Sequence, residues 1–489
     1  MYIDMSKQRA SLLLSILCFA CMTGCDSGSS DGIVAVTENN NQNGSSDTAA
    51  SSLNILLTQT PESQTHDPYA VFTFTAEGAQ AYDCLLDEQV INDCQSPLSL
   101  MPLDEGAHQL SIGALDSAGN LGSQVVYNWT VLPLFTSVEG TETHSDLIKT
   151  SIHPDRAEPN SWRGIFRINC DFAHSSYNDP IVFPLQENAA HLHRFYGNTL
   201  TDHTSTAASL FMQGESSCQG NTLNLSSYWL PALLAPSYDP TSGDRLIDSQ
   251  GEPAWKVVPA VVGNDDEAHE IFYYSAGVDD LESIQTIPVG LRIIAGNAMS
   301  QPGQEQNTSI VRWHCQSWGS DDSSNPRFSS SIPECLAPDR VRLDIFFPSC
   351  WNGIDLDSFD HKSHMTYPVN EGGPNGSYCP ASHPVPIVRP SYHYAFGVKP
   401  DVFEPQTQSS RGWKLASDMY STAEQAGGMS LHGDWFNAWH PQAMQALLDN
   451  CIKQGLDCHD GNLANGFRLS GTRPGSQFEP QIINAGLGF

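Results

Sequence analysis

Ten cysteines constrain this chain more than any other feature of its sequence. The chain has 13 cysteines, three of them within the first 25 residues, and the remaining ten are spread from residue 84 to residue 458. No two of these ten are spaced as CxxC, which disfavours a thiolate zinc site or a thioredoxin-like redox motif. In an exported chain such a set is predicted to form disulfides, each stabilising the fold by roughly 2–4 kcal/mol. The ten are Cys84, Cys94, Cys170, Cys218, Cys315, Cys335, Cys350, Cys379, Cys451 and Cys458.

The pairing is not fixed by sequence, but the closest neighbours, Cys84–Cys94 and Cys451–Cys458, are the expected local pairs. The compartment follows from residues 1–25, which resemble a bacterial lipoprotein signal peptide. A basic start and a short apolar run lead to MTGC, which is similar to the lipobox whose cysteine, here Cys25, is acylated. Methionine stands where leucine is usual, and cleavage at an earlier cysteine or at a non-lipid site is the alternative.

Residues 26–52 are too polar to form a core and are predicted to be a disordered tether. The expected location is therefore outside the cytoplasm, with the chain lipid-anchored to the bacterial membrane and facing the periplasm or the cell exterior. The 22 Lys and Arg against 55 Asp and Glu give a formal charge of −33, which repels phosphate backbones and argues against nucleic acid as a partner.

Residues 53–133 form a self-contained block of segments with a period of two. AVFTFTA, HQLSIGALD and VVYNWTV alternate apolar and polar residues, and the turn DSAGNLG separates the last two. A short disulfide hairpin followed by the run from Gly106 to Asn120 resembles bacterial immunoglobulin-like modules. That resemblance implies a β-sandwich used for spacing or adhesion. Trp129 is expected in the core of this block, with a ligand platform as the alternative.

Residues 140–489 contain no clear linker or repeat and are predicted to form one larger domain. RGIFRINC, DPIVFP, VGLRIIAGN, IVRWHCQ and VRLDIFFPSC are predicted strands, and HPQAMQALLDNCIKQG is the strongest predicted helix. The predicted fold class is mainly β: an N-terminal immunoglobulin-like β-sandwich, then a larger β-sandwich or jelly-roll-like domain with long loops and few helices.

Histidines and acidic residues gather in a few segments of this larger domain. In HLHRFYGNT, an extended backbone would project His191 and His193 to the same face, as in a metal site on a sheet, and Arg194 to the other. The alternative is a pair of hydrogen-bonded histidines in a polar cleft. CWNGIDLDSFDHKSHMTYP and SLHGDWFNAWH add further histidines, carboxylates and tryptophans, a combination typical of sites that act on sugars. The alternative for the first of these two segments is a disulfide-tied loop whose Asp side chains cap turns. The alternative for the second is that its tryptophans belong to the core.

Several segments occur in an order that resembles a known family. They are DPIVFP…HLHRFYGNT, SSCQGNTLNLSSYWLPAL, IPVGLRIIAGN, FPSCWNGIDLDSFDHKSHMTYP, CPASHPVPI and HGDWFNAW. From about residue 167 to 439 the chain resembles the domain of unknown function numbered nineteen-ninety-six, found in secreted fungal proteins and in some bacteria. No activity comes with that family. Its fungal members are often joined to sugar-binding modules, which implies a polysaccharide setting.

Two functions fit these observations. The first is a carbohydrate-active hydrolase or lyase, and the second is a non-catalytic cell-surface carbohydrate-binding or adhesion protein. The expected partner is an extracellular polysaccharide or cell-wall glycan. The cofactor is left open, with a divalent metal ion the one that the histidines suggest. No G-x-S-x-G elbow, HExxH, P-loop or dinucleotide fingerprint is present to favour another chemistry.

Each candidate site residue has an expected role. The candidate catalytic residues are Asp360, His361, His364, His432 and Asp434. The candidate substrate-binding residues are Arg194, Arg292, Trp351, Tyr367 and Trp435, with Trp229 as a further platform in the non-catalytic alternative. The candidate metal ligands are His191 and His193. We expect the two ligands to share one cleft with a histidine from 361–364 and with His432 or Asp434.

Overall fold

The computed structural model describes residues 53–100, 102–135, 144–157, 164–261, 270–317, 327–370, 376–422 and 425–482. The predicted signal, the predicted lipidation site Cys25 and the predicted tether lie outside the described residues. The chain divides into two compact units, one ending at Pro133 and the other beginning at Leu134. The described residues are mainly β with few helices, as the sequence predicts. They contain no helix that is both long enough and apolar enough to cross a membrane.

The first unit contains two antiparallel-rich sheets around one apolar core. Its segments with a period of two form strands, in which every second side chain faces the core. Phe72 and Phe74, two residues apart, both face inward and pack in one core with Trp129, which is only 2% exposed. The three-stranded sheet is β1 (Ile55–Gln59), β3 (Ala70–Ala76) and β6 (Leu98–Leu100). The five-stranded sheet is β2 (Gln64–Thr65), β8 (Leu121–Val131), β7 (Gly106–Leu115), β4 (Ala81–Leu86) and β5 (Gln89–Ile91).

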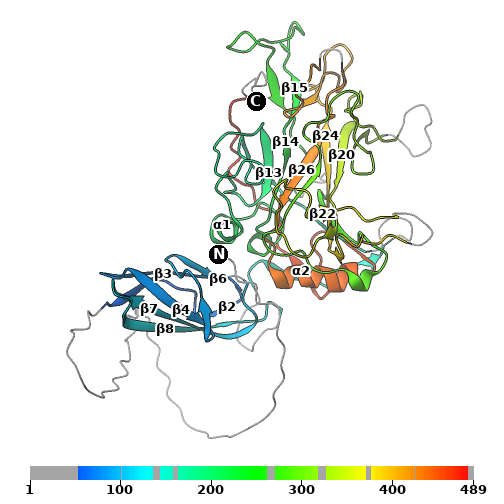
Figure 1. The fold of residues 1–489 in the computed structure, drawn as a ribbon. Coiled ribbons are helices and arrows are strands. Elements are labelled where there is room, and N and C mark those ends of the chain that lie inside the picture. The colour runs from blue at the N-terminus through cyan, green and yellow to red at the C-terminus, as the bar shows by residue number, and fades with distance from the viewer. Residues whose placement is uncertain are drawn as a thin grey trace, which may run out of the picture. The chain divides into compact units, whose positions relative to one another are not determined.

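The second unit is built on a five-stranded and a seven-stranded sheet. The five-stranded sheet has the order β12 (Phe172–Ser176), β13 (His193–Gly197), β14 (Ser227–Pro231), β26 (His432–Phe436) and β18 (Arg292–Gly296). The seven-stranded sheet has the order β10 (Asp155–Arg156), β27 (Leu456–Cys458), β11 (Ile165–Ile168), β17 (Phe272–Ser275), β24 (Arg389–Gly397), β20 (Arg340–Phe346) and β19 (Val311–Cys315). Figure 1 shows β13, β14 and β26 side by side, although β26 comes some 200 residues later in the chain.

Smaller sheets complete the second unit. They are β16 (Trp255–Val257), β15 (Leu233–Pro236) and β25 (Lys414–Leu415); β22 (Met365–Thr366), β21 (Cys350–Trp351) and β23 (Val385–Pro386); and β28 (Phe467–Leu469) with β9 (Leu147–Lys149).

Aromatic side chains hold the two large sheets together. The ring of Tyr228, on β14, stacks on Phe272 of β17 with 4.1 Å between centroids. Tyr196, on β13, packs against Tyr394 of β24 with 5.2 Å between centroids. Trp435 of β26 also lies in this core and is fully buried. One face of the five-stranded sheet, which we call the inner face, is therefore closed by the seven-stranded sheet.

The outer face of the five-stranded sheet is covered by loops and a short helix. Residues that lie opposite each other on antiparallel strands share a face of the sheet. Trp229 of β14 lies opposite Phe195 of β13 on one side and opposite Asp434 of β26 on the other, so all three are on this face. Phe195 and Trp229 form a small second core there with Ile181 and Leu210. Leu210 belongs to α1 (Ala207–Met212), which the sequence did not predict and which begins with a capping box at Thr206.

Local predictions were right for most strands and wrong for one. The helix predicted near residue 440 is α2 (Pro441–Leu447), and it continues as a π-helical turn over Leu448–Ile452. DPIVFP is not a strand. Asp179 Oδ1 instead accepts hydrogen bonds from the backbone N–H groups of Ile181 and Val182 and closes a turn.

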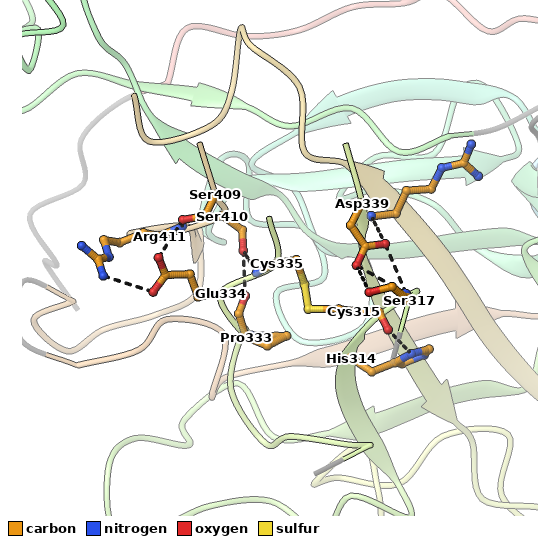
Figure 2. Close-up of a disulfide and its surroundings, with 11 residues drawn as sticks. His314, Cys315, Ser317, Pro333, Glu334, Cys335, Asp339, Ser409, Ser410 and Arg411 are labelled. Atoms are coloured by element: carbon orange, nitrogen blue, oxygen red, sulfur yellow. Dashed lines mark hydrogen bonds and ion pairs between the residues drawn. A yellow bond between two sulfur atoms is a disulfide. The ribbon is translucent and has the colours of Figure 1, made fainter. Parts of the chain in front are cut away.

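All ten cysteines beyond residue 25 form disulfides, as predicted, including both expected local pairs. The five bonds are Cys84–Cys94, Cys170–Cys218, Cys315–Cys335, Cys350–Cys379 and Cys451–Cys458. Figure 2 shows the surroundings of Cys315–Cys335, where Asp339 accepts hydrogen bonds from Ser317. These two sulfurs lie near Asp339 in an arrangement that could hold a metal ion. Because the sulfurs are bonded to each other, neither is a thiolate ligand.

Candidate metal centre

The HLH motif places two histidines at the start of β13. His193 begins the strand and lies opposite Pro231, on the same outer face as Phe195. His191 precedes it by two residues, and the two imidazole centroids are 4.2 Å apart. Arg194 alternates to the other face and lies opposite Leu230.

Strand β26 supplies the next two residues through the motif HGDWF. His432 and Asp434 project to the outer face, where they oppose Gly296 and Ile294 of β18. Gly433, between them, projects inward, where a β-carbon would lie 3.0 Å from Ile345 and 3.1 Å from Tyr392. A small residue here lets β26 approach the seven-stranded sheet, which fixes the positions of its two polar neighbours.

Asp179 also lies beside these four residues, and the sequence does not predict it as a site residue. It is the turn-closing residue described above, so one carboxylate oxygen is held by backbone N–H groups. Its other oxygen lies a long 3.5 Å from the indole nitrogen of Trp229. The Asp-Pro pair is a turn signal that could have placed this residue in a loop and not in a strand.

The five side chains form two overlapping groups of possible metal ligands. One group is His191, His193 and His432, and the other is Asp179, His193 and Asp434. Within each group, one ligand atom from every residue lies within 4.8 Å of the others. The ring of His432 lies 5.0 Å from His191 and 6.0 Å from His193 between centroids. The sequence regions around residues 180, 190 and 430 thus meet at one place.

Several polar atoms of this cluster are buried without a hydrogen-bond partner. They are His191 Nε2, His193 Nε2 and Asp434 Oδ2. Leaving such an atom unpaired costs about 1–3 kcal/mol, more for a charged group. His193 shares one group with His191 and the other with Asp434, so leaving these atoms unsatisfied is costly unless a ligand satisfies them.

Backbone carbonyls orient two of the imidazoles. Nδ1 of His193 lies 3.3 Å from the carbonyl oxygen of Asn178, and Nδ1 of His432 lies 2.8 Å from that of Ser430. When Nδ1–H donates to these carbonyls, Nε2 carries the lone pair and faces the cluster. A hydrogen bond from the non-ligating nitrogen to a carbonyl is the usual support of a histidine metal ligand.

The electrostatics of the cluster favour neutral imidazoles. Burial lowers the pKa of His193 to about 4. Burial, with the neighbouring His193, lowers the pKa of His432 to about 3. The pKa of Asp434 is raised well above its usual range by burial and then by the charge of Asp179. Neutral imidazoles are the form that binds metal ions, and a cation would relieve the repulsion between the two carboxylates.

The donor set fits a divalent transition metal ion. Neighbouring donors in a tetrahedral zinc shell are roughly 3.3 Å apart for metal–nitrogen distances of about 2.0–2.1 Å. Atoms already within 4.8 Å of one another need only small side-chain rotations to reach that spacing. Imidazole with carboxylate is a ligand set taken by zinc, copper, iron and nickel. We call these five residues, Asp179, His191, His193, His432 and Asp434, the His/Asp cluster.

The histidines and the aspartate of segment 360–364 have other partners. Asp360 is exposed and accepts hydrogen bonds from the backbone N–H groups of Lys362 and Ser363, which hold its pKa below the usual range. His361 lies 3.0 Å from both carboxylate oxygens of Asp357. His364 lies 2.9 Å from Ser358 Oγ and 2.7 Å from the carbonyl oxygen of Arg292, so both of its nitrogens are engaged. Ligand roles for these residues would require breaking those contacts.

The two candidate arginines are also engaged in pairs. Arg194 forms an ion pair with Glu479, and its guanidinium lies over the ring of Phe172. Arg292 Nη1 lies 3.1 Å from Asp357 Oδ2. Neither guanidinium can bind an anionic substrate without giving up its present partner.

The candidate aromatic platforms divide into core and surface residues. Trp435 and Trp229 are both fully buried and offer no ring face to a ligand arriving from solvent, which corrects the role expected for them. The physical reason is the strand period, because Asp434 faces outward and its neighbour Trp435 must face inward. Trp351 is half-buried, and its indole N–H donates to the carbonyl of Asp355. Tyr367 is half-buried and lines a surface cleft.

A second polar array lies on the seven-stranded sheet. Ser391 Oγ is 2.9 Å from His393 Nε2, and His393 Nδ1 is 2.8 Å from Asp344 Oδ1. This order of groups is that of a serine nucleophile with its base and orienting acid. Ser391 is fully buried, however, in the middle of β24. The array is therefore a buried hydrogen-bond network with no access for a substrate.

The family of the second unit follows from residues 179–439, which match the model of the family described as "Domain of unknown function (DUF1996)". The chain belongs to this family. The match begins at Asp179, 12 residues after the start of the resemblance seen in the sequence, and contains the whole His/Asp cluster. The family description assigns no activity.

No curated protein matches the chain. The chain is similar to the fibronectin(III)-like modules of Clostridium thermocellum CbhA, with 25% identity over 16% of this chain and 96% of that one, at a TM-score of 0.15.

Proposed function

We propose that the second unit is a metal-dependent protein that acts on an extracellular polysaccharide as a hydrolase or lyase. We also propose that the chain is exported and held at the bacterial membrane by a lipid on Cys25. The observation that carries the metal assignment is the His/Asp cluster. Three imidazoles converge there with two carboxylates, and unpartnered Nε2 atoms of His191 and His193 are buried among them.

A metal bound at the cluster would polarise a substrate oxygen and lower the pKa of a bound water. The chain's own residues supply the rest of the arrangement. His193 and His432 are held by backbone carbonyls, so their orientation does not depend on the ligand. Asp179 is fixed by its turn. Asp434 Oδ2 has no hydrogen-bond partner and lies 3.9 Å from His432 Nε2, so it is available to a cation or to a proton.

The proposed substrate class rests on the setting and on the surface next to the cluster. A lipoprotein signal and ten oxidised cysteines suit the exterior of a cell. Polar side chains with a half-buried tyrosine line the cleft nearby, and hydroxyl-rich sugars are bound by such combinations.

Metal analysis of the exported protein tests the metal centre. Protein purified without chelators should contain about one equivalent of a transition metal by mass spectrometry, and His193→Ala and His432→Ala should each lose most of it. His153→Ala is the matched control, because His153 is exposed and outside the cluster. Equal metal content in all four proteins would contradict the assignment.

Activity is tested separately with a polysaccharide panel. Wild-type protein should release reducing ends or unsaturated products from at least one polysaccharide, and added chelator should stop the release. Product-free binding of a polysaccharide by the metal-loaded protein would instead support the non-catalytic alternative. If the protein neither binds any glycan nor forms a product from one, both the catalytic and the non-catalytic function are excluded.

A further inference from the structure

A surface cleft lies beside the His/Asp cluster. Its volume is about 370 Å³, and it is lined by segments 294–310 and 362–367 with Pro348. Strand β18 forms one wall through Ile294 and Gly296. This volume lies within the usual range of about 300–1,000 Å³ for ligand sites.

The cleft and the cluster occupy the same face of the same sheet. In the register of β18 and β26, Ile294 lies opposite Asp434, and Gly296 lies opposite His432. Opposed residues of an antiparallel pair project to one side. The wall of the cleft is therefore the strand next to the one that carries two cluster residues.

Lys362 joins the two regions. It lines the cleft, and its ammonium donates a hydrogen bond of 2.7 Å to the carbonyl oxygen of Gly296. Although much of the side chain is exposed, this contact turns its charged end toward β18. Its charge interacts with both Asp434 and His432. Lys362 thus stands at the boundary between the cleft and the cluster.

The lining of the cleft combines apolar with polar residues and carries little net charge. Its uncharged polar side chains are amides and hydroxyls, including Asn297, Gln304, Asn307 and Thr366. One lysine and one glutamate, Lys362 and Glu305, are the charged residues of the lining. Asn and Gln side chains and hydroxyls can both donate to and accept from sugar hydroxyls, which are themselves donors and acceptors.

Tyr367 gives the cleft an aromatic surface. Its hydroxyl donates to the carbonyl oxygen of Phe346 at 2.9 Å, which fixes the ring in place. A fixed ring can pack against the apolar face of a sugar without losing much side-chain entropy. No arginine among the described residues lines the cleft, and the candidate substrate-binding arginines Arg194 and Arg292 are both paired with carboxylates.

We propose that this cleft is the subsite for an uncharged, hydroxyl-rich saccharide chain, with Tyr367 as its stacking surface and Lys362 at its junction with the His/Asp cluster. This inference rests on the proposed function and names its substrate class as a neutral glycan in preference to a uronate polymer. The near balance of charge carries that preference, because a polyanionic chain would need several unpaired cations.

Calorimetric titration of the metal-loaded full chain with defined oligosaccharides tests the proposal. The neutral probes are the hexasaccharides of cellulose, laminarin, mannan and xylan, and the anionic probe is a galacturonate hexasaccharide. At least one neutral probe should bind more tightly than the galacturonate. Tyr367→Ala should weaken that binding at least tenfold, whereas Tyr367→Phe, which keeps the ring, should stay within about threefold.

Charge at the junction is tested with a second set of variants. Lys362→Gln should weaken binding of the neutral probe several-fold, and Lys362→Arg should restore most of it. Lys149→Gln is the matched control, because it removes an exposed lysine outside the cleft.

The metal content of every variant separates this proposal from the proposed function. Normal metal content with unchanged binding in Tyr367→Ala and Lys362→Gln would overturn the cleft assignment alone. Tighter binding of the galacturonate, or no binding of any neutral probe at millimolar concentration, would also overturn it. Wild-type protein that contains no bound metal would instead refute the proposed metal centre.

Discussion

The rings of His191 and His193 lie 4.2 Å apart between centroids, and both of their Nε2 atoms are buried without a partner. Two neutral imidazoles gain little from facing each other in this way. The HLH spacing on an extended segment makes the pair possible, and the arrival of His432 from β26 makes it a group of three. The cation that we propose for this cluster would account for the relationship, and its consequences can be measured.

Metal should raise the thermal stability of the second unit. A ligand that binds only the folded state at 100 times its Kd stabilises by about 2.7 kcal/mol, so a zinc or copper titration should shift the melting transition upward. Chelator should reverse the shift. His193→Ala should abolish it, and His153→Ala should leave it intact. An identical metal-induced shift in His193→Ala would show that the ion binds elsewhere.

The metal-free protein should lose stability as the pH falls from 6.5 to about 4. An unfolded histidine gains its proton below pH 6.5, whereas folded His193 resists protonation until about pH 4. The unfolded state therefore binds more protons in this window, and stability is complete above it and lost through it. The loss from His193 alone is about 3 kcal/mol.

Denaturant unfolding at several pH values checks this dependence against His193→Gln, which cannot be protonated. The slope of the free energy of unfolding against pH should be shallower in this variant than in wild type. Equal slopes would mean that the imidazole of His193 is already charged, or freely solvated, in the folded protein.

Much of the local structure was predictable because apolar and polar residues alternate with the period of two that is typical of strands. AVFTFTA became β3 without a change of bounds, and the alternation in HLHRFYG correctly separated Arg194 from His193. The same rule could have placed Trp435 in the core, since it directly follows the outward-facing Asp434. Its aromatic character had suggested a sugar platform instead.

The complete site was beyond sequence reasoning for a topological reason. Asp179, His193 and Asp434 meet because β26 inserts between β14 and β18 in the sheet order. Nothing in a single sequence specifies that crossover. Asp179 was further hidden by its apolar neighbours Ile181 and Val182, which suggested a strand although its carboxylate closes a turn. The partners of His361 and His364 likewise depend on the fold of their loop.

The Cys350–Cys379 disulfide should support the cleft more than the metal centre. It closes a segment with a sequence separation of 29 that carries Lys362 and Tyr367. Replacing both cysteines with alanine should destabilise the second unit by about 3–4 kcal/mol and weaken oligosaccharide binding, with metal content unchanged. The same replacement at Cys84–Cys94, in the first unit, should leave both properties of the second unit intact. Loss of metal from the Cys350/Cys379 variant would show that this loop also holds the cluster together.

Lipid attachment should depend on Cys25 alone. Cells fed a radioactive fatty acid should label the wild-type protein, and Cys25→Ala should remove the label and release the protein from the membrane fraction. Cys21→Ala is the matched control within the same predicted signal. An unlabelled and fully soluble wild-type protein would contradict the lipobox interpretation.

Asp434→Asn should separate a metal ligand from a structural residue. Burial and the charge of Asp179 raise the pKa of Asp434, so its ionised form is costly in the metal-free protein. The amide has nearly the same shape and no charge, and at pH 8 it should make the metal-free protein more stable by on the order of 1 kcal/mol. The same substitution should weaken metal binding at least tenfold, because the carboxylate's charge is lost.

These opposite effects set Asp434→Asn apart from an ordinary destabilising substitution. Asp155→Asn, at an exposed carboxylate of β10, should change neither quantity. A metal-free Asp434→Asn protein that is less stable than wild type and binds metal equally well would assign Asp434 to the fold. Greater stability without metal, combined with weaker metal binding, is expected when a metal ligand destabilises the metal-free fold and the bound ion offsets that destabilisation.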